Sequence, residues 1–306
     1  MSNNNFRVCY QSIFWRWGLD DAMHLAEKVI QVISVLFVFI TLLSSPLWAH
    51  EPKGLQEFFT LWAGMLPIIL AAPHGGRQPI PGISARRGIG VAQFMTGRDN
   101  NTDELAQKVA SKIEEKFGAK PFLVVAQFER KYVDANRSRA GAYESAAASA
   151  YYDTYHHALE KACDQARRDW GRGLLLDIHG QAAEGETIFR GTDNGKSVTD
   201  LQQRFGREAL TGERSILGQL KLRGYKIAPS LENNEERRYS GGYTTRTYGS
   251  HRGTSIDAIQ LEFGTSLRSR TNLERTATDL AAAISVFAGE YLLFRRRSNS
   301  LSTTAP

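Results

Sequence analysis

The chain has 306 residues, of which 42% are hydrophobic and 23% are charged, an ordinary composition for a globular protein that excludes disordered, collagen-like and coiled-coil chains. Its 38 Lys and Arg residues exceed its 32 Asp and Glu residues by only six charges, so we expect no nucleic-acid partner. Two isolated cysteines, Cys9 and Cys163, cannot build a CxxC zinc site or a disulfide framework. A bound metal would therefore need histidine and carboxylate ligands.

The N-terminal region reads as a targeting segment. Residues 29–48 form an apolar run that ends in a proline-containing break and a small residue, a pattern typical of exported precursors. We expect residues 1–49 to be a signal peptide, with Met23 as the true start or an unusually long leader, or else an uncleaved signal anchor. The run is long enough to span a bilayer, so any membrane tether would lie in residues 29–48. The predicted location is periplasmic or extracellular.

Beyond this segment, short apolar runs alternate with longer helical patterns. We expect strands at 66–73, 121–128, 173–180 and 255–264, and helices at 102–117, 143–170 and 272–293, with two short helices within 198–223. This alternation predicts an α/β fold, in which a mainly parallel mixed sheet is flanked by helices. The last residues, 295–306, are expected to be a disordered tail.

Three of the predicted strands end in residues that can carry chemistry. His74 follows the first strand in a Pro-His-Gly-Gly turn, His179 ends the third and Glu262 lies near the end of the last. Because ligands bind at the carboxyl ends of parallel strands, we expect these side chains to meet. Asp177 shares a strand face with His179 and could accept the second ring N–H of a metal-ligating histidine.

The third metal ligand would be a carboxylate. Asp99, in the loop before the predicted helix at 102–117, is the first candidate, and Asp103 and Glu104 compete with it. The latter two fall in the first helical turn, where acidic side chains also favour the helix dipole. Two histidines and one carboxylate with an open position are typical of a catalytic zinc site.

Further residues suggest how a substrate would be handled. Glu262 is a charged residue in an apolar strand, and it is either a general base that activates water or a partner of an arginine. Arg137 offers a planar fork for a substrate carboxylate, and Asn136 adds a neutral donor. Arg130 could stabilise a developing oxyanion.

Two other segments contain candidate groups. Residues 233–251 are rich in Gly, Tyr and Arg and are expected to form a long loop over the site, because long structureless loops in compact domains are often functional. His156 and His157 are adjacent on the predicted helix at 143–170, and solvent-exposed positions are the favoured interpretation for them.

These motifs, taken in order, resemble the N-formylglutamate amidohydrolase family, within the zinc carboxypeptidase-like hydrolases. The resemblance runs from Leu66 to Leu293 and rests on Pro-His-Gly-Gly at 73–76, Asp99 with Thr-Asp-Glu-Leu at 102–105, Asp-Ala-Asn-Arg at 134–137, Tyr-His at 155–156, Leu-Asp-Ile-His-Gly at 176–180 and Leu-Glu-Phe-Gly at 261–264.

The resemblance implies a zinc carboxypeptidase-like fold and assigns a role to each candidate. Zinc would be bound by His74, Asp99 and His179, and Glu262 would be the acid/base residue. Asn136 and Arg137 would bind the substrate carboxylate. Some carboxypeptidase-like relatives place the acidic ligand three residues after the first histidine, where this chain has Arg77.

The sequence therefore predicts a zinc hydrolase domain over residues 50–294 that acts on carbon–nitrogen bonds. The expected reaction is cleavage of an amide bond, of the N-formyl or N-acyl amino acid type, in a small molecule or peptide with a free carboxylate. One alternative is a carboxypeptidase or cell-wall peptide amidase of the same fold, which export would favour. The other is a catalytically silent ligand-binding protein.

Overall fold

The computed structural model describes residues 54–233 and 235–292. The predicted signal peptide or anchor at 1–49 and the predicted tail at 295–306 lie outside the described residues. Within the two described ranges, none of the helices combines the length and the apolar character needed to cross a bilayer.

In the described part of the chain, one mixed sheet holds seven strands in the order β1-β3-β2-β4-β7-β5-β6. The strands are β1 (Phe59–Trp62), β2 (Ile68–Ala72), β3 (Phe122–Ala126), β4 (Gly173–Gly180), β5 (Thr187–Gly191), β6 (Lys226–Ala228) and β7 (Ile256–Phe263). The central strands β3, β2, β4 and β7 run parallel. β1 is antiparallel to β3, and β5 is antiparallel to β7. The expected mainly parallel mixed sheet is thus confirmed.

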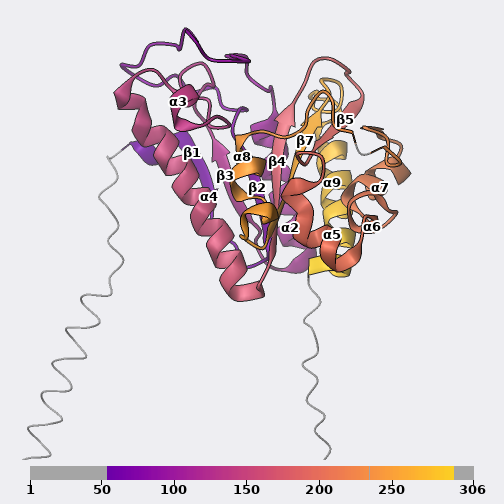
Figure 1. The fold of residues 1–306 in the computed structure, drawn as a ribbon. Helices are drawn as coiled ribbons and strands as arrows, with labels where there is room; N and C mark the ends of the chain where they lie inside the picture. Colours follow the sequence, from indigo (N-terminus) through magenta and orange to yellow (C-terminus); the bar gives the residue numbers. More distant parts are fainter. Residues whose placement is uncertain (1–53, 234, 293–306) are drawn as a thin grey trace, which may run out of the picture. The chain divides into compact units, whose positions relative to one another are not determined.

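Helices cover both faces of this sheet. They are α2 (Thr102–Phe117), α3 (Arg139–Ala142), α4 (Ser149–Trp170), α5 (Thr199–Phe205), α6 (Glu208–Thr211), α7 (Ile216–Leu222), α8 (Tyr243–Tyr248) and α9 (Leu273–Phe287), with the shorter turns η1 (Leu55–Phe58), η2 (Ala146–Ala148), η3 (Lys196–Val198), η4 (Ser250–Arg252) and η5 (Ala288–Leu292). In Figure 1, α4 lies on one side of the sheet, and α2 and α9 lie on the other.

The side chains of each strand alternate between the two faces of the sheet, which creates one hydrophobic core on each face. In β2, Ile68 and Leu70 face the core under α2 and α9, whereas Ile69 and Ala71 face the core under α4. Both faces of the central strands are therefore buried, which explains why they read as continuous apolar runs. This arrangement leaves the carboxyl ends of β2, β4 and β7 as neighbours along one edge.

Several helix boundaries differ from the sequence expectation. The helix expected at 143–170 begins only at Ser149, because Tyr143 is extended and η2 intervenes. The region 198–223 holds three short helices instead of two, and the helix expected to run to 293 changes to a π-helical turn at 288–292. The helix at 102–117 begins and ends as expected.

The turn after β2 depends on close backbone packing. A Cβ atom on Gly76 would overlap the backbone of Gln127 and Phe128, and one on Gly75 would overlap the backbone nitrogen of Asp103. Neither glycine belongs to the residues with positive φ. Glycine is needed here because other backbone segments approach closely, rather than because the backbone is left-handed.

We therefore expect Gly76→Ala to lower the free energy of unfolding by about 1–3 kcal/mol, since overpacking against a backbone cannot be relieved by a rotamer change. Urea denaturation would measure the loss. Gly289→Ala is the matched control, because a Cβ there meets no atom within 4 Å. Equal stability of the two variants would contradict the close-approach argument.

Candidate metal centre

The sheet brings the chemistry-bearing residues to one edge. His74 follows β2 by two residues, His179 lies near the end of β4, and Glu262 lies near the end of β7. His179 and Glu262 are direct partners in the parallel β4–β7 register. Asp99 comes from the loop before α2, where its backbone N–H donates to the carbonyl oxygen of His74 at 3.0 Å. The fold thus gathers residues that are far apart in sequence.

His74, Asp99 and His179 form a compact buried group, here called the His–Asp–His cluster. The Oδ2 atom of Asp99 lies 3.5 Å from His74 Nδ1 and 3.2 Å from His179 Nδ1. The two imidazole rings meet edge to face with centroids 4.8 Å apart. One ligand atom from each residue lies within 4.8 Å of the others, which is a spacing that could hold a metal ion.

Two buried carboxylates fix the orientation of these rings. His74 Nε2 lies 2.7 Å from Asp134 Oδ1, and His179 Nε2 lies 2.9 Å from Asp177 Oδ2. A ring that donates its Nε2–H in this way directs its Nδ1 atom at the cluster. His74 Nδ1 is buried and has no hydrogen-bond partner, as expected of an atom prepared to bind a metal.

Of these two orienting residues, sequence reasoning found only one. Asp177 is in the expected place, because strand alternation puts it on the same face as His179. Asp134 was noted only as the first residue of the Asp-Ala-Asn-Arg segment. Its partner His74 is 60 residues away in the chain, so no local pattern indicates the contact.

The electrostatics of the cluster depend on these contacts. Burial alone would raise the pKa of Asp99, but the hydrogen bond from His179 and the close approach of His74 hold it well below its usual range. Burial alone would lower the pKa of His179, but the carboxylates of Asp177 and Asp99 raise it well above its usual value. The site therefore favours a charged carboxylate and positive charge close to it.

The competing acidic residues lie elsewhere. Glu104 forms an ion pair with Arg270 at 2.6 Å, and a carboxylate oxygen of Asp103 lies 3.6 Å from Arg77. Asp99 is the acidic residue that faces both histidines. Asp103 and Glu104 lie in the first helical turn, where acidic side chains favour the helix dipole, and this agrees with their position outside the cluster.

Glu262 is buried beside the cluster. Its Oε1 accepts a hydrogen bond from Gln260 Nε2 at 2.8 Å. Burial raises its pKa, and the carboxylates of Asp99 and Asp177 add to this effect while His179 opposes it. A raised pKa makes this carboxyl group a better proton acceptor, which suits a general acid or base.

The two arginines differ in how they face the cluster. Arg130 donates from Nε to Asp134 Oδ2 at 3.0 Å, and its Nη1 lies 3.9 Å from Asp99 Oδ1. Arg137 donates from Nη2 to the carbonyl oxygen of Gln93 at 2.8 Å, and about a quarter of its side chain (26%) is exposed. Arg130 is thus directed at the cluster, whereas Arg137 lies at its rim.

Asn136 is bonded through its amide oxygen, and its Nδ2 donates to Gln260 Oε1 at 3.5 Å. Its Oδ1 accepts the backbone N–H of Thr244 at 2.8 Å, and its Nδ2 lies 3.1 Å from His179 Nε2. This buried arrangement differs from the carboxylate-binding role that the resemblance implies. Asn136 instead lies between the first turn of α8, to which Thr244 belongs, and His179 on β4.

The segment 233–251 is not the structureless loop that its composition suggested. It contains α8 and most of η4, and α8 packs against the half-buried His156. The Nδ1 atom of His156 lies 3.0 Å from the hydroxyl of Tyr248, and its Nε2 lies 3.0 Å from the carbonyl oxygen of Ala135. The expectation that His156 is solvent-exposed is therefore wrong, because α8 and the 134–137 segment cover this part of α4.

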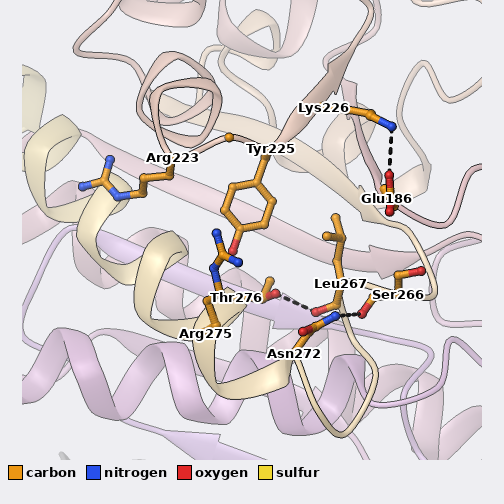
Figure 2. A pocket seen from close by; sticks show the side chains of 10 residues that line it. Glu186, Arg223, Tyr225, Lys226, Ser266, Leu267, Asn272, Arg275 and Thr276 are labelled. Atoms are coloured by element: carbon orange, nitrogen blue, oxygen red, sulfur yellow. Dashed lines mark hydrogen bonds and ion pairs between the residues drawn. The ribbon is translucent and has the colours of Figure 1, made fainter.

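A separate pocket of about 270 Å³ lies between β6 and the start of α9 (Figure 2). Lys226 pairs with Glu186 at 2.8 Å, and the hydroxyl of Tyr225 donates to Asp279 at 2.9 Å. Its lining contains no member of the His–Asp–His cluster. Because its lining offers a single carboxylate, Glu186, and no histidine or cysteine, this pocket is not a second candidate metal centre.

The burial of His156 generates a pH-dependent prediction. Burial lowers its pKa from 6.5 to about 4, so between these values the unfolded chain binds a proton that the folded chain does not. Stability should therefore fall as the pH falls through this window, with a contribution on the order of 2–3 kcal/mol. Urea unfolding at pH 7 and pH 4 should show a smaller acid loss for His156→Gln than for the parent protein.

The exposed neighbour supplies the control for this measurement. His157→Gln should leave the acid loss of stability unchanged, because His157 is exposed on α4. An equal acid loss in the His156→Gln variant and the parent would show that His156 does not carry this pH dependence.

Comparisons with known proteins bear on the fold and the family. A crystal structure of an N-formylglutamate amidohydrolase from Ralstonia eutropha JMP134 is 19% identical, covers 76% of this chain and 99% of its own, and has a TM-score of 0.51. A gene product of Agrobacterium tumefaciens is 16% identical, covers 78% of this chain and 97% of its own, and has a TM-score of 0.50. At these identities the likeness shows a shared fold.

The comparisons of sequence match a smaller part of the chain than the comparisons of structure do. None of the curated proteins matches the chain. The family model described as N-formylglutamate amidohydrolase matches residues 142–268, a range that includes His179 and Glu262. This match supports hydrolysis of a carbon–nitrogen bond, and it confirms the resemblance of the chain to the N-formylglutamate amidohydrolase family.

Proposed function

We propose that this protein is a zinc-dependent amidohydrolase that cleaves the amide bond of an N-formyl or N-acyl amino acid carrying a free carboxylate. The observation that carries the proposal is the geometry of the His–Asp–His cluster. Two buried histidines present Nδ1 to the carboxylate of Asp99, and Glu262 lies beside His179 on the neighbouring strand.

The donor set suits zinc. Two imidazole nitrogens and one carboxylate oxygen are a common set of protein ligands at catalytic zinc sites, which keep a further position open. The buried Nδ1 of His74, which has no hydrogen-bond partner, supports this fit. When bound, zinc supplies Lewis acidity that polarises the scissile carbonyl and acidifies water.

The chain's own residues would move the proton and hold the charges. Glu262 takes the proton from the attacking water and delivers it to the leaving nitrogen, which its raised pKa favours. Arg130, whose Nη1 lies 3.9 Å from Asp99 Oδ1, stabilises the developing oxyanion. Arg137 binds the substrate carboxylate with its planar fork from the rim of the site.

A second candidate function is a carboxypeptidase or cell-wall peptide amidase. It is favoured by the apolar run at 29–48, from which we propose export to the periplasm or the cell exterior. Hydrolysis assays with N-acyl amino acids and with cell-wall peptides distinguish the two candidate functions. A higher kcat/KM on peptides would favour the second candidate, while the metal and Glu262 would keep the same roles.

Metal content tests the proposed cofactor. Elemental analysis of the purified protein should find about one zinc per chain, and His74→Ala and His179→Ala should each lose it because each removes a ligand. His157→Ala, at an exposed histidine on α4, should keep its zinc. A parent protein that takes up no metal when zinc is offered would contradict the proposal and favour a catalytically silent binding protein.

Replacement of the proposed base tests the mechanism. Glu262→Gln should lower kcat by about 10²–10⁴-fold, the usual contribution of a positioned acid or base, while zinc content and ligand affinity stay unchanged. Glu115→Gln, at an exposed position of α2, is the matched control. Turnover by Glu262→Gln at the parent rate would remove Glu262 from the mechanism.

A further inference from the structure

Residues 236–244, here called the 236–244 arch, are held at their first end by a buried ion pair. Arg190 Nε donates to Glu236 Oε1 at 2.7 Å, and both side chains are at most 1% exposed. The other carboxylate oxygen of Glu236 accepts the backbone N–H groups of Thr192 at 2.7 Å and Asn194 at 2.9 Å. Because removing one partner of such a pair leaves a buried unpaired charge, this end of the arch is firmly fixed.

The other end of the arch lies on the metal centre. The backbone N–H of Thr244 donates to Asn136 Oδ1 at 2.8 Å, and Asn136 Nδ2 lies 3.1 Å from His179 Nε2. A Cβ atom on Gly242 would overlap the amide of Asn136, so the arch backbone rests directly on this side chain. The arch is therefore connected to a proposed metal ligand through one residue.

Tyr239 lies between the two anchors, on the side of Glu262. Its ring packs edge-on against Phe189 with centroids 5.0 Å apart, and Phe189 is the register partner of Glu262 in the β5–β7 pair. A Cβ atom on Gly191 would lie 2.9 Å from the carbonyl oxygen of Tyr239, so the arch backbone also touches the end of β5. The Arg238 guanidinium lies 5.8 Å from the ring centroid.

The phenol of Tyr239 remains a hydrogen-bond donor at neutral pH. Burial and the nearby carboxylates of Glu262 and Asp99 raise its pKa, against an opposing contact with Arg238. A buried aromatic body with one polar tip is a common way for a protein to contact a ligand, because it supplies both packing and direction. The packing of the ring on Phe189, whose register partner is Glu262, places Tyr239 on the sheet face that carries Glu262 and His179.

We infer that Tyr239 is a substrate-contacting residue: its hydroxyl donates a hydrogen bond to the bound N-acyl amino acid next to Glu262, and its ring forms an aromatic wall with Phe189. This inference rests on the proposed function and adds a specificity determinant to it. The two anchors hold the arch in place before the substrate arrives, so the contact needs little ordering upon binding.

Tyr239→Phe tests the contact, because it removes the hydroxyl and keeps the packing on Phe189. The zinc-loaded variant should show a KM for N-formyl-L-glutamate about tenfold above the parent value, with a smaller change in kcat, as expected for one lost neutral hydrogen bond. In a Glu262→Gln background, calorimetry with the same compound should show about tenfold weaker binding. Zinc content and the melting temperature should stay at the parent values.

Tyr225→Phe is the matched control, because it also removes a tyrosine hydroxyl, which here donates to Asp279. Tyr225 lines the separate pocket (Figure 2). Tyr225→Phe should leave KM and binding unchanged. Parent-like KM and affinity in Tyr239→Phe would overturn the inference while leaving the proposed function intact. The parent protein could instead bind a panel of N-acyl amino acids without hydrolysing any of them. If Tyr239→Phe then binds these compounds more weakly, the contact is supported and the proposed function is wrong. If the parent neither binds nor hydrolyses any member of the panel, both are wrong.

Discussion

Two buried carboxylates, Asp134 and Asp177, decide which nitrogen of each histidine faces the centre of the site. Each accepts the Nε2–H of one ring, so both Nδ1 atoms converge on Asp99. Without these contacts a buried imidazole could turn or change tautomer, and the ligand geometry would be lost. The preorganisation of the site therefore depends on two side chains that would not themselves touch the metal.

The same region gathers buried carboxylates and several arginines, of which Arg86, Arg130 and Arg137 all lie within 4 Å of Asp134. Asp99, Asp134, Asp177 and Glu262 are all at most 7% exposed, and Arg130 is the cation that reaches two of them. Burying several carboxylates is costly unless positive charge compensates them. The arginines provide part of this compensation, and the case for a cation between the histidines rests on the geometry of the His–Asp–His cluster.

Local sequence patterns predicted the strands that are buried on both faces of the sheet. β2, β4 and β7 are buried on both faces and read as apolar runs, which is why His74, His179 and Glu262 could be placed at their ends. β1 and β6 were missed because they have only 4 and 3 residues and lie at the two edges of the sheet. β5 is as long and as buried as β2, but it pairs antiparallel with β7. β5 also contains Arg190, whose burial depends on Glu236, 46 residues further along the chain. No window of adjacent residues contains that information.

The residues that sequence reasoning misplaced or missed share a physical cause. Asp134 and Asn136 have short polar side chains in a loop, and their roles arise from partners 60 and 108 residues away. His156 was assigned to solvent because adjacent histidines on a helix usually are exposed, yet α8 covers it. The structure uses the same device twice, at Asp134 beside His74 and at Glu236 beside Arg190: a buried carboxylate accepts several hydrogen bonds and so fixes a loop in one position. One of these loops orients His74 in the His–Asp–His cluster and the other holds Tyr239 on the Glu262 side, so both ends of this edge of the sheet are fixed by buried carboxylates.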